Sequence, residues 1–214
     1  MTYIENVFFC LAAPLVVALF CVHRFARRSL AFILTGMVAC LFSSYISTFF
    51  AGLVGATALD ASLEISPLIE EVLKLLPVAF YLMVYEPKRN DVAGEALMIA
   101  VGFATLENAC YLLANDAGNT FHIVIRGFST GAMHVVCGAI TATVLRGAWE
   151  SLYFRIIVTL GVLCVAITCH GIYNVLVNQQ GIGAWIGYLL PLVIGTVTIA
   201  GRKKLYGKVP VPFP

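Results

Sequence analysis

Two adjacent glutamates and a lysine form the run of residues most suggestive of chemistry. Glu70, Glu71 and Lys74 follow Pro67 in an otherwise apolar stretch. On a helix, Lys74 is four residues from Glu70 and three from Glu71, so either carboxylate can reach its ammonium group. One carboxylate can then be neutralised while the other remains available for a reaction. The simpler interpretation is an ion pair that only satisfies itself.

Three later apolar stretches carry polar residues of the same kind. Glu107 lies in the first, Arg126 and His134 are eight residues apart in the second, and His170 and Asn174 are one helical turn apart in the third. A lone histidine on an apolar helix is usually a satisfied core residue. Two histidines on separate helices, with acidic residues on two more, are rarely accidental and indicate a site.

Such a set suits the hydrolysis of an amide bond. A carboxylate shielded from bulk water can act as a general base on a water molecule, and imidazole or carboxamide groups can stabilise an oxyanion. There is no Gly-x-Ser-x-Gly sequence and no pair of aspartates on two helices, so serine and aspartyl mechanisms are disfavoured. The predicted catalytic residues are Glu70 as base (Glu71 nearly as good), Glu107 to share or orient the water, and His134, His170 and Asn174 around the scissile carbonyl.

A metal-dependent version uses the same residues. Glu107, His134 and His170 could bind zinc, with Glu70 or Glu71 as the base, because three protein ligands and a water are the usual catalytic zinc arrangement. There is no His-Glu-x-x-His motif, so the spacing does not decide between the two versions. We expect no cofactor, and we keep zinc as the alternative.

The composition requires a membrane. Of 214 residues, 61% are hydrophobic and 11% are charged, whereas soluble domains average about 25% charged residues. A core of this size could not hide so much apolar surface, so lipid must surround the protein. No basic stretch with interleaved aromatic residues is present, which argues against a nucleic-acid partner. We expect one membrane-embedded domain, 1–214, with its catalytic core at about 63–178.

Seven segments are long and apolar enough, or nearly so, to be transmembrane helices, which need about 20 residues. They predict an all-α, multi-pass transmembrane bundle. The segments are 4–22, 30–52, 63–85, 92–114, 121–145, 153–177 and 184–200.

The basic residues predict the orientation. Of the 13 lysines and arginines, all except Lys74 and Arg126 fall on one side if seven helices alternate in direction. Because cytoplasmic loops are enriched in lysine and arginine, the N-terminus is expected outside and the C-terminus inside. The residues on that side are Arg24, Arg27, Arg28, Lys88, Arg89, Arg146, Arg155, Arg202, Lys203, Lys204 and Lys208.

Depth then predicts that the polar residues meet. Glu70, Glu107 and His170 each lie about seven residues from the external end of their helix, and His134 about thirteen. At about 1.5 Å of rise per residue, their levels differ by about 10 Å, all in the outer half of the bilayer. A charged side chain at a helix centre costs roughly 2.5–3.5 kcal/mol on insertion scales, so a functional reason for keeping several of them is expected.

At these residues the sequence resembles the PrsW family of bacterial intramembrane proteases. Four short motifs carry the resemblance, in family order, across residues 66–174. They are an EExxK run (Glu70, Glu71, Lys74), an FxxxEN run (Phe103, Glu107, Asn108), the segment from Arg126 to His134, and an HGxYN run (His170, Gly171, Tyr173, Asn174).

The resemblance implies a glutamate-dependent or metal-dependent protease that makes a first cut in a membrane-anchored anti-sigma factor. It also implies a bacterial or archaeal plasma membrane as the location. It also implies membership of the superfamily that contains the CAAX prenyl endopeptidases and bacteriocin-immunity proteins. In that superfamily the first glutamate of the pair is the water-activating base, here Glu70, and the HxxxN element serves the oxyanion, here His170 and Asn174. Many PrsW sequences have Asp at the position of Asn174, and CAAX-type enzymes have His at that of Glu107. Lys74, Arg126 and Asn108 are supporting residues.

Two other classes of function remain open. A proton-coupled transporter would also use intramembrane glutamate and histidine, but it needs a polar path through both leaflets, and the stretches 75–83 and 156–166 offer few ionisable groups. A catalytically silent immunity or scaffold protein is the other alternative.

Overall fold

The described residues fold into helices alone. The computed structural model describes residues 4–85, 91–114, 119–148 and 152–205. Within them no strand occurs, so the predicted all-α class is confirmed. The predicted basic residues Lys88, Arg89 and Lys208 lie outside the described residues. The elements are α1 (Ile4–Cys21), α2 (Arg24–Val54), α3 (Ala58–Asp60), a π-helix η1 (Ala61–Ile65), α4 (Ser66–Tyr85), α5 (Asp91–Ala114), α6 (Thr120–Ala148), α7 (Leu152–Val177) and α8 (Ile182–Leu205).

Each of the seven predicted segments coincides with one long helix. By length and composition, five of the described helices could cross a membrane: α1, α2, α5, α6 and α7. Helix α4 is not among these five, and it carries the charged residues Glu70, Glu71 and Lys74 within its 20 residues. Helix α8 is not among them either, because its described apolar part, Ile182–Val197, is shorter. The chain is therefore a multi-pass membrane protein, and the count of seven spans stays a prediction.

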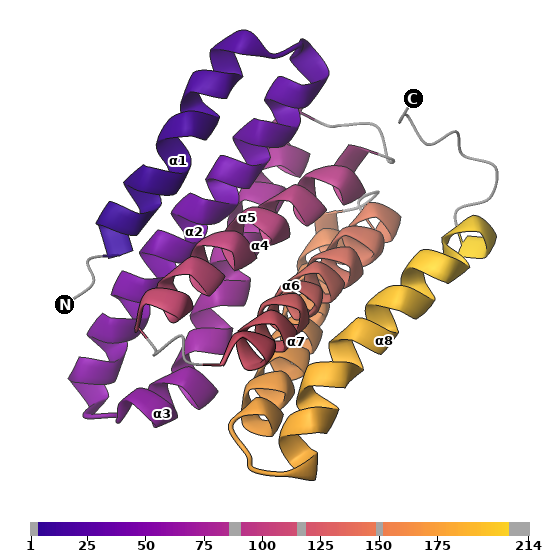
Figure 1. The fold of residues 1–214 in the computed structure, drawn as a ribbon. Helices are drawn as coiled ribbons and strands as arrows, with labels where there is room; N and C mark the ends of the chain where they lie inside the picture. Colours follow the sequence, from indigo (N-terminus) through magenta and orange to yellow (C-terminus); the bar gives the residue numbers. More distant parts are fainter. Residues whose placement is uncertain (1–3, 86–90, 115–118, 149–151, 206–214) are drawn as a thin grey trace.

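Successive long helices run in opposite directions along the bundle (Figure 1). The turn between α1 and α2 lies at one end, and α3 and the turn between α7 and α8 lie at the other. Helix α2 packs along α5, α5 along α6, and α6 against both α7 and α8, while α4 packs against α2 and α7. This order places α4, α5, α6 and α7 around a shared interior.

Glycines allow α2 and α5 to lie unusually close together. A Cβ atom on Gly36 would collide with the backbone of Ile99, and one on Gly102 would collide with the backbone of Ile33. Small residues at helix crossings permit this approach in membrane proteins, where van der Waals packing replaces the hydrophobic effect between helices. The crossing fixes α5, and with it Glu107, against α2.

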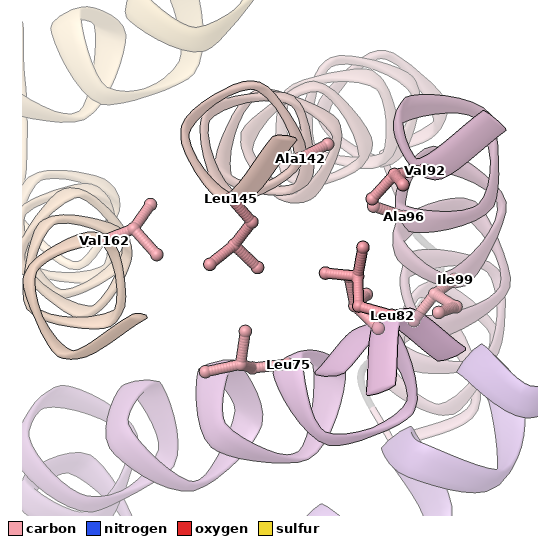
Figure 2. Packing of buried hydrophobic residues seen from close by; sticks show 9 residues of the cluster. Leu75, Leu82, Val92, Ala96, Ile99, Ala142, Leu145 and Val162 are labelled. Atoms are coloured by element: carbon pink, nitrogen blue, oxygen red, sulfur yellow. The ribbon is translucent and has the colours of Figure 1, made fainter. Parts of the chain in front are cut away.

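One half of the bundle interior is filled by apolar side chains. Figure 2 shows Leu75 and Leu82 of α4 converging with Leu145 of α6 and Val162 of α7. The whole cluster of buried residues is Leu75, Val78, Leu82, Val92, Ala96, Ile99, Ala142, Leu145 and Val162. A polar path does not pass through this part of the interior.

Glu95 of α5, a buried carboxylate outside the cluster of Glu70 and His170, lies at the edge of this apolar half. Its Oε1 is 2.5 Å from Nη2 of Arg28 on α2. Arg28 also donates to the hydroxyl of Tyr81 and lies against that ring. The α2 arginine therefore offsets this carboxylate, which belongs to a structural contact between helices rather than to the cluster of Glu70 and His170.

A short helix and a π-helical turn lead directly into α4. Thr57 and Asp60 form a reciprocal capping box at the start of α3, and hydrogen bonds from Thr57 hold the pKa of the Asp60 carboxyl below its usual value. Residues 61–65 then form the π-helix, in which Glu64 is exposed. π-Helical turns often occur at functional sites because they interrupt the regular register. Here the turn precedes Glu70 by one to two turns of helix.

We expect Gly102→Ala to destabilise the protein by about 1–3 kcal/mol, the usual cost of an overpacked contact. The added methyl group must push α2 away from α5, because the atoms that it meets are backbone atoms of Ile33. Thermal unfolding of the purified protein in detergent measures the effect. Gly161→Ala on α7 is the matched control, since nothing lies within 4 Å of its added carbon. Equal unfolding temperatures for both variants would contradict the close crossing.

Candidate active site

A buried ion pair on α4 forms the centre of the polar cluster. Nζ of Lys74 lies 2.5 Å from Oε1 of Glu71, and both residues are buried. The same glutamate oxygen accepts a hydrogen bond of 2.8 Å from Nδ1 of His170 on α7. The carboxylate that the lysine neutralises is thus Glu71, a choice that the sequence spacing had left open.

Lys74 also sets the protonation of His134 on α6. Its Nζ lies 2.8 Å from Nδ1 of His134, and an ammonium group can only donate, so Nδ1 accepts. In a neutral imidazole the proton then resides on Nε2, which donates to Oε2 of Glu107 at 2.5 Å. The chain Glu71–Lys74–His134–Glu107 links α4, α6 and α5 through charges and hydrogen bonds.

Arg126 holds the far side of Glu107. Its Nη2 lies 3.5 Å from Oε1 of Glu107, and its Nη1 donates to Oδ1 of Asn108 at 2.9 Å. The guanidinium carbon lies 3.3 Å from the centre of the Tyr111 ring. Asn108 donates in turn to the carbonyl of Gly127 at 3.1 Å. These contacts fit the supporting role predicted for Arg126 and Asn108, because they fix Glu107 between α5 and α6.

Glu70 differs from the other acidic residues of the cluster. Its carboxylate accepts no hydrogen bond from the described part of the chain, and its Oε2 is buried without a partner. That oxygen lies 3.7 Å from Nε2 of His170, beyond hydrogen-bonding distance. Nδ1 of His170 donates to Glu71, and its Nε2 faces Glu70. A buried carboxylate oxygen that lacks a partner among the described residues is costly, and a water or a cation would satisfy it.

The side-chain amide of Asn174 bonds to the π-helix. Its Nδ2 donates at 2.8 Å to the carbonyl of Ser62 in the π-helix, rather than toward Glu70 or Glu107. The hydroxyl of Tyr173, its neighbour on α7, hydrogen bonds to Thr130 of α6 at 2.8 Å. The hydrogen bond of Asn174 ties η1 to α7, and the oxyanion role expected for His170 and Asn174 stays a prediction.

The potential metal ligands form a different set from the predicted one. Glu70, His134 and His170 each offer an atom within 4.8 Å of the other two, so Glu70 occupies the place that we expected for Glu107. Glu70 and His170 fit zinc, because their facing atoms are free and Glu71 binds the other nitrogen of His170, as is usual for ligating histidines. His134 does not fit, since Lys74 and Glu107 engage both of its nitrogens.

A cavity of about 420 Å³ opens onto this cluster. Glu70 and Glu107 both line it, whereas the two buried histidines lie behind them. Helix α2 forms another part of its wall and contributes Ser43, Ser44, Ser47 and Thr48. Sequence reasoning missed this wall, although hydroxyl residues one turn apart on an apolar helix were a visible signal.

Removing the central lysine should be costly. We expect Lys74→Met to destabilise the protein by about 3–5 kcal/mol, because it leaves Glu71 buried and uncompensated. The double variant Lys74→Met with Glu71→Gln removes both charges and should lose markedly less than the sum of the two single changes. Denaturant unfolding in detergent measures all three. Strict additivity would show that the ion pair contributes nothing.

Comparison with known proteins identifies the family. A family model described as "PrsW family intramembrane metalloprotease" matches residues 13–200, which is most of the chain. Searches of curated proteins and of solved structures gave no match. The matched region contains the four motifs and all the residues of the polar cluster. The chain therefore belongs to the PrsW family of intramembrane proteases.

Proposed function

We propose that this protein is an intramembrane endopeptidase that cuts a membrane-anchored protein with a water molecule activated by Glu70. One observation carries the proposal: the Glu70 carboxylate, alone among the acidic groups of the cluster, accepts no hydrogen bond from the described residues and lines the cavity. A base must be free to accept a proton from its water. Glu71 and Glu107 are engaged by Lys74 and His134 and are less suited to that task.

The surrounding groups supply the remaining functions. In the proposed reaction, Glu70 takes a proton from the water, whose oxygen adds to the scissile carbonyl, and then returns that proton to the leaving nitrogen. Nε2 of His170 lies on the same side as Glu70 and can accept the second hydrogen bond of the water. Glu107, the other carboxylate in the cavity wall, orients the water or the substrate amide. The Nδ2 of Asn174 carries two hydrogens and donates one of them to Ser62, so the other could serve the oxyanion.

The position of the site suggests where the cut falls. Glu70 and Glu107 line a cavity together with residues of α3 and η1, and none of the apolar cluster of Leu75, Leu82 and Val162 lines it. Helix α3 lies at the end of the bundle away from the turn between α1 and α2 (Figure 1). With the predicted orientation, that end faces the extracytoplasmic side. We therefore propose cleavage near the outer surface of the membrane, in a single-span substrate of the anti-sigma-factor kind that the resemblance implies.

The apolar half of the interior also favours hydrolysis over transport. A proton-coupled transporter needs ionisable groups along a path through both leaflets. The buried cluster from Leu75 to Val162 interrupts that path within the described residues. A silent scaffold, the remaining alternative, would not need an unpartnered buried carboxylate oxygen, which is costly to keep.

Glu70→Gln should slow substrate cleavage at least about 100-fold, the lower range for loss of a general base. The change keeps the shape of the side chain and removes its basicity. Co-expression with a panel of tagged single-span proteins, followed by immunoblotting for the cut product, measures it. Glu64→Gln is the matched control, because Glu64 is exposed on η1 and outside the cluster. Normal cleavage by Glu70→Gln would refute this mechanism.

The zinc alternative has its own support in the pairing of His170 with Glu71 and in the family description. Because His134 lacks a free nitrogen, we expect cleavage to persist after exhaustive chelation and the purified protein to contain far less than one zinc per chain. Metal analysis by mass spectrometry and a chelator titration measure both. Stoichiometric zinc that disappears in His170→Ala, together with inactivation by chelator, would establish the metal-dependent version with Glu70, His134 and His170 as ligands.

A further inference from the structure

One part of the cavity wall belongs to α2, which the mechanism does not use. This wall carries hydroxyl groups and small side chains, among them Ser43, Ser47 and Ala51. The π-helix adds Ala61 and Ser62 on an adjoining side. The space between this wall and Glu70 is about 420 Å³, within the range of about 300–1,000 Å³ for ligand sites.

Ser47 is unusual among the hydroxyl residues of α2. Ser43 donates to the carbonyl of Cys40 at 2.8 Å, and Thr48 donates to that of Ser44 at 2.7 Å. Serine and threonine side chains in an apolar helix commonly donate in this way to a carbonyl of the preceding turn. Ser47 is 8% exposed, and its Oγ has no hydrogen-bond partner among the residues that the structure describes. A buried hydroxyl without a partner, in the wall of a cavity, points to a polar ligand.

A peptide substrate would need hydrogen-bond partners of this kind for its main chain. A peptide bond in a transmembrane helix is shielded by its own hydrogen bonds, so the segment must unwind before water can attack. Unwound backbone groups in a membrane are costly unless protein or water satisfies them. At about 420 Å³, the cavity holds only a few residues, and their side chains must be small.

The geometry points to this cavity as the substrate-binding site, in which Ser47 hydrogen bonds the main chain of an unwound segment rich in small residues such as alanine and serine. The inference rests on the proposed function, because it places that segment between α2 and the carboxylates of Glu70 and Glu107. Ala51, one turn beyond Ser47, limits the size of the side chains that can enter. Ser47 and Ala51 thus contribute to binding and specificity rather than to proton transfer.

Direct binding tests the site without requiring cleavage. The probe is a short dye-labelled peptide of alternating alanine and serine with blocked ends, and its Kd is measured by fluorescence anisotropy with the full chain in detergent. The Glu70→Gln background prevents turnover. In that background Ser47→Ala should raise the Kd about threefold to tenfold, the loss expected for one hydrogen bond. Thr35→Ala is the control, because this α2 hydroxyl bonds to Ala31 and does not line the cavity.

A second pair of variants tests the space itself. Ala51→Leu should fill the cavity and abolish binding of the probe. Gly52→Leu adds the same side chain at the next position of α2, where nothing lies within 4 Å, and should leave the Kd unchanged. A matching peptide of alternating leucine and serine should bind at least tenfold more weakly than the alanine peptide to the Glu70→Gln protein.

The outcomes separate this inference from the proposed function. If Ala51→Leu binds the peptide normally, or if the Glu70→Gln protein binds no peptide, the cavity is not the substrate site, even if Glu70→Gln abolishes cleavage. If Ala51→Leu and Ser47→Ala weaken binding as expected but Glu70→Gln still cleaves co-expressed substrates, the site stands and the role of Glu70 is wrong.

Discussion

The ion pair between Glu71 and Lys74 is the interaction on which the rest of the polar cluster depends. Both groups are buried, and each would be costly without the other. Their remaining hydrogen-bonding capacity reaches outward, since Glu71 accepts from His170 and Lys74 donates to His134. One contact on α4 therefore orients imidazoles on two other helices and, through His134, the Glu107 carboxylate on α5.

Because Glu71 is paired with Lys74 and His170, Glu70 lies in a different environment. Neighbouring residues on an α-helix project about 100° apart, so the two carboxylates cannot both face the lysine, α6 and α7 in the same way. Glu71 is directed to Lys74 and His170, while Glu70 lines the cavity bounded by α2 and η1. Glu71 therefore has a structural role in the ion pair, and the adjacent Glu70 is available for the proposed chemistry. The close crossing of α2 and α5 at Gly36 and Gly102 sets the α2 part of the cavity wall.

Much of this arrangement followed from the sequence because charges inside a membrane are costly. Because they are costly, the few charged residues in apolar stretches stand out as candidates for a functional site. Helical spacing predicts which of them share a face of a helix, and the alternating direction of the helices predicts that Glu70, Glu107, His134 and His170 lie at similar depth. Spacing could not decide which glutamate pairs with Lys74, since both positions are within reach of it. It also could not foresee that Asn174 bonds to Ser62, because the π-helix that presents this carbonyl has no simple sequence pattern. Ser47 escaped notice because a serine in an apolar helix normally satisfies itself.

The central claim is that carboxylates of α4 and α5 face one cavity, and cross-linking tests it most directly. In a variant without native cysteines, Glu70→Cys and Glu107→Cys are combined and treated with a short thiol-specific cross-linker. The account predicts an internal cross-link, detected by mass spectrometry of the digested protein, because both positions line the same space. The pair of Glu64→Cys and Glu107→Cys should not be joined, since Glu64 is outside that wall. Absence of the first cross-link, with each cysteine reactive alone, would contradict the account.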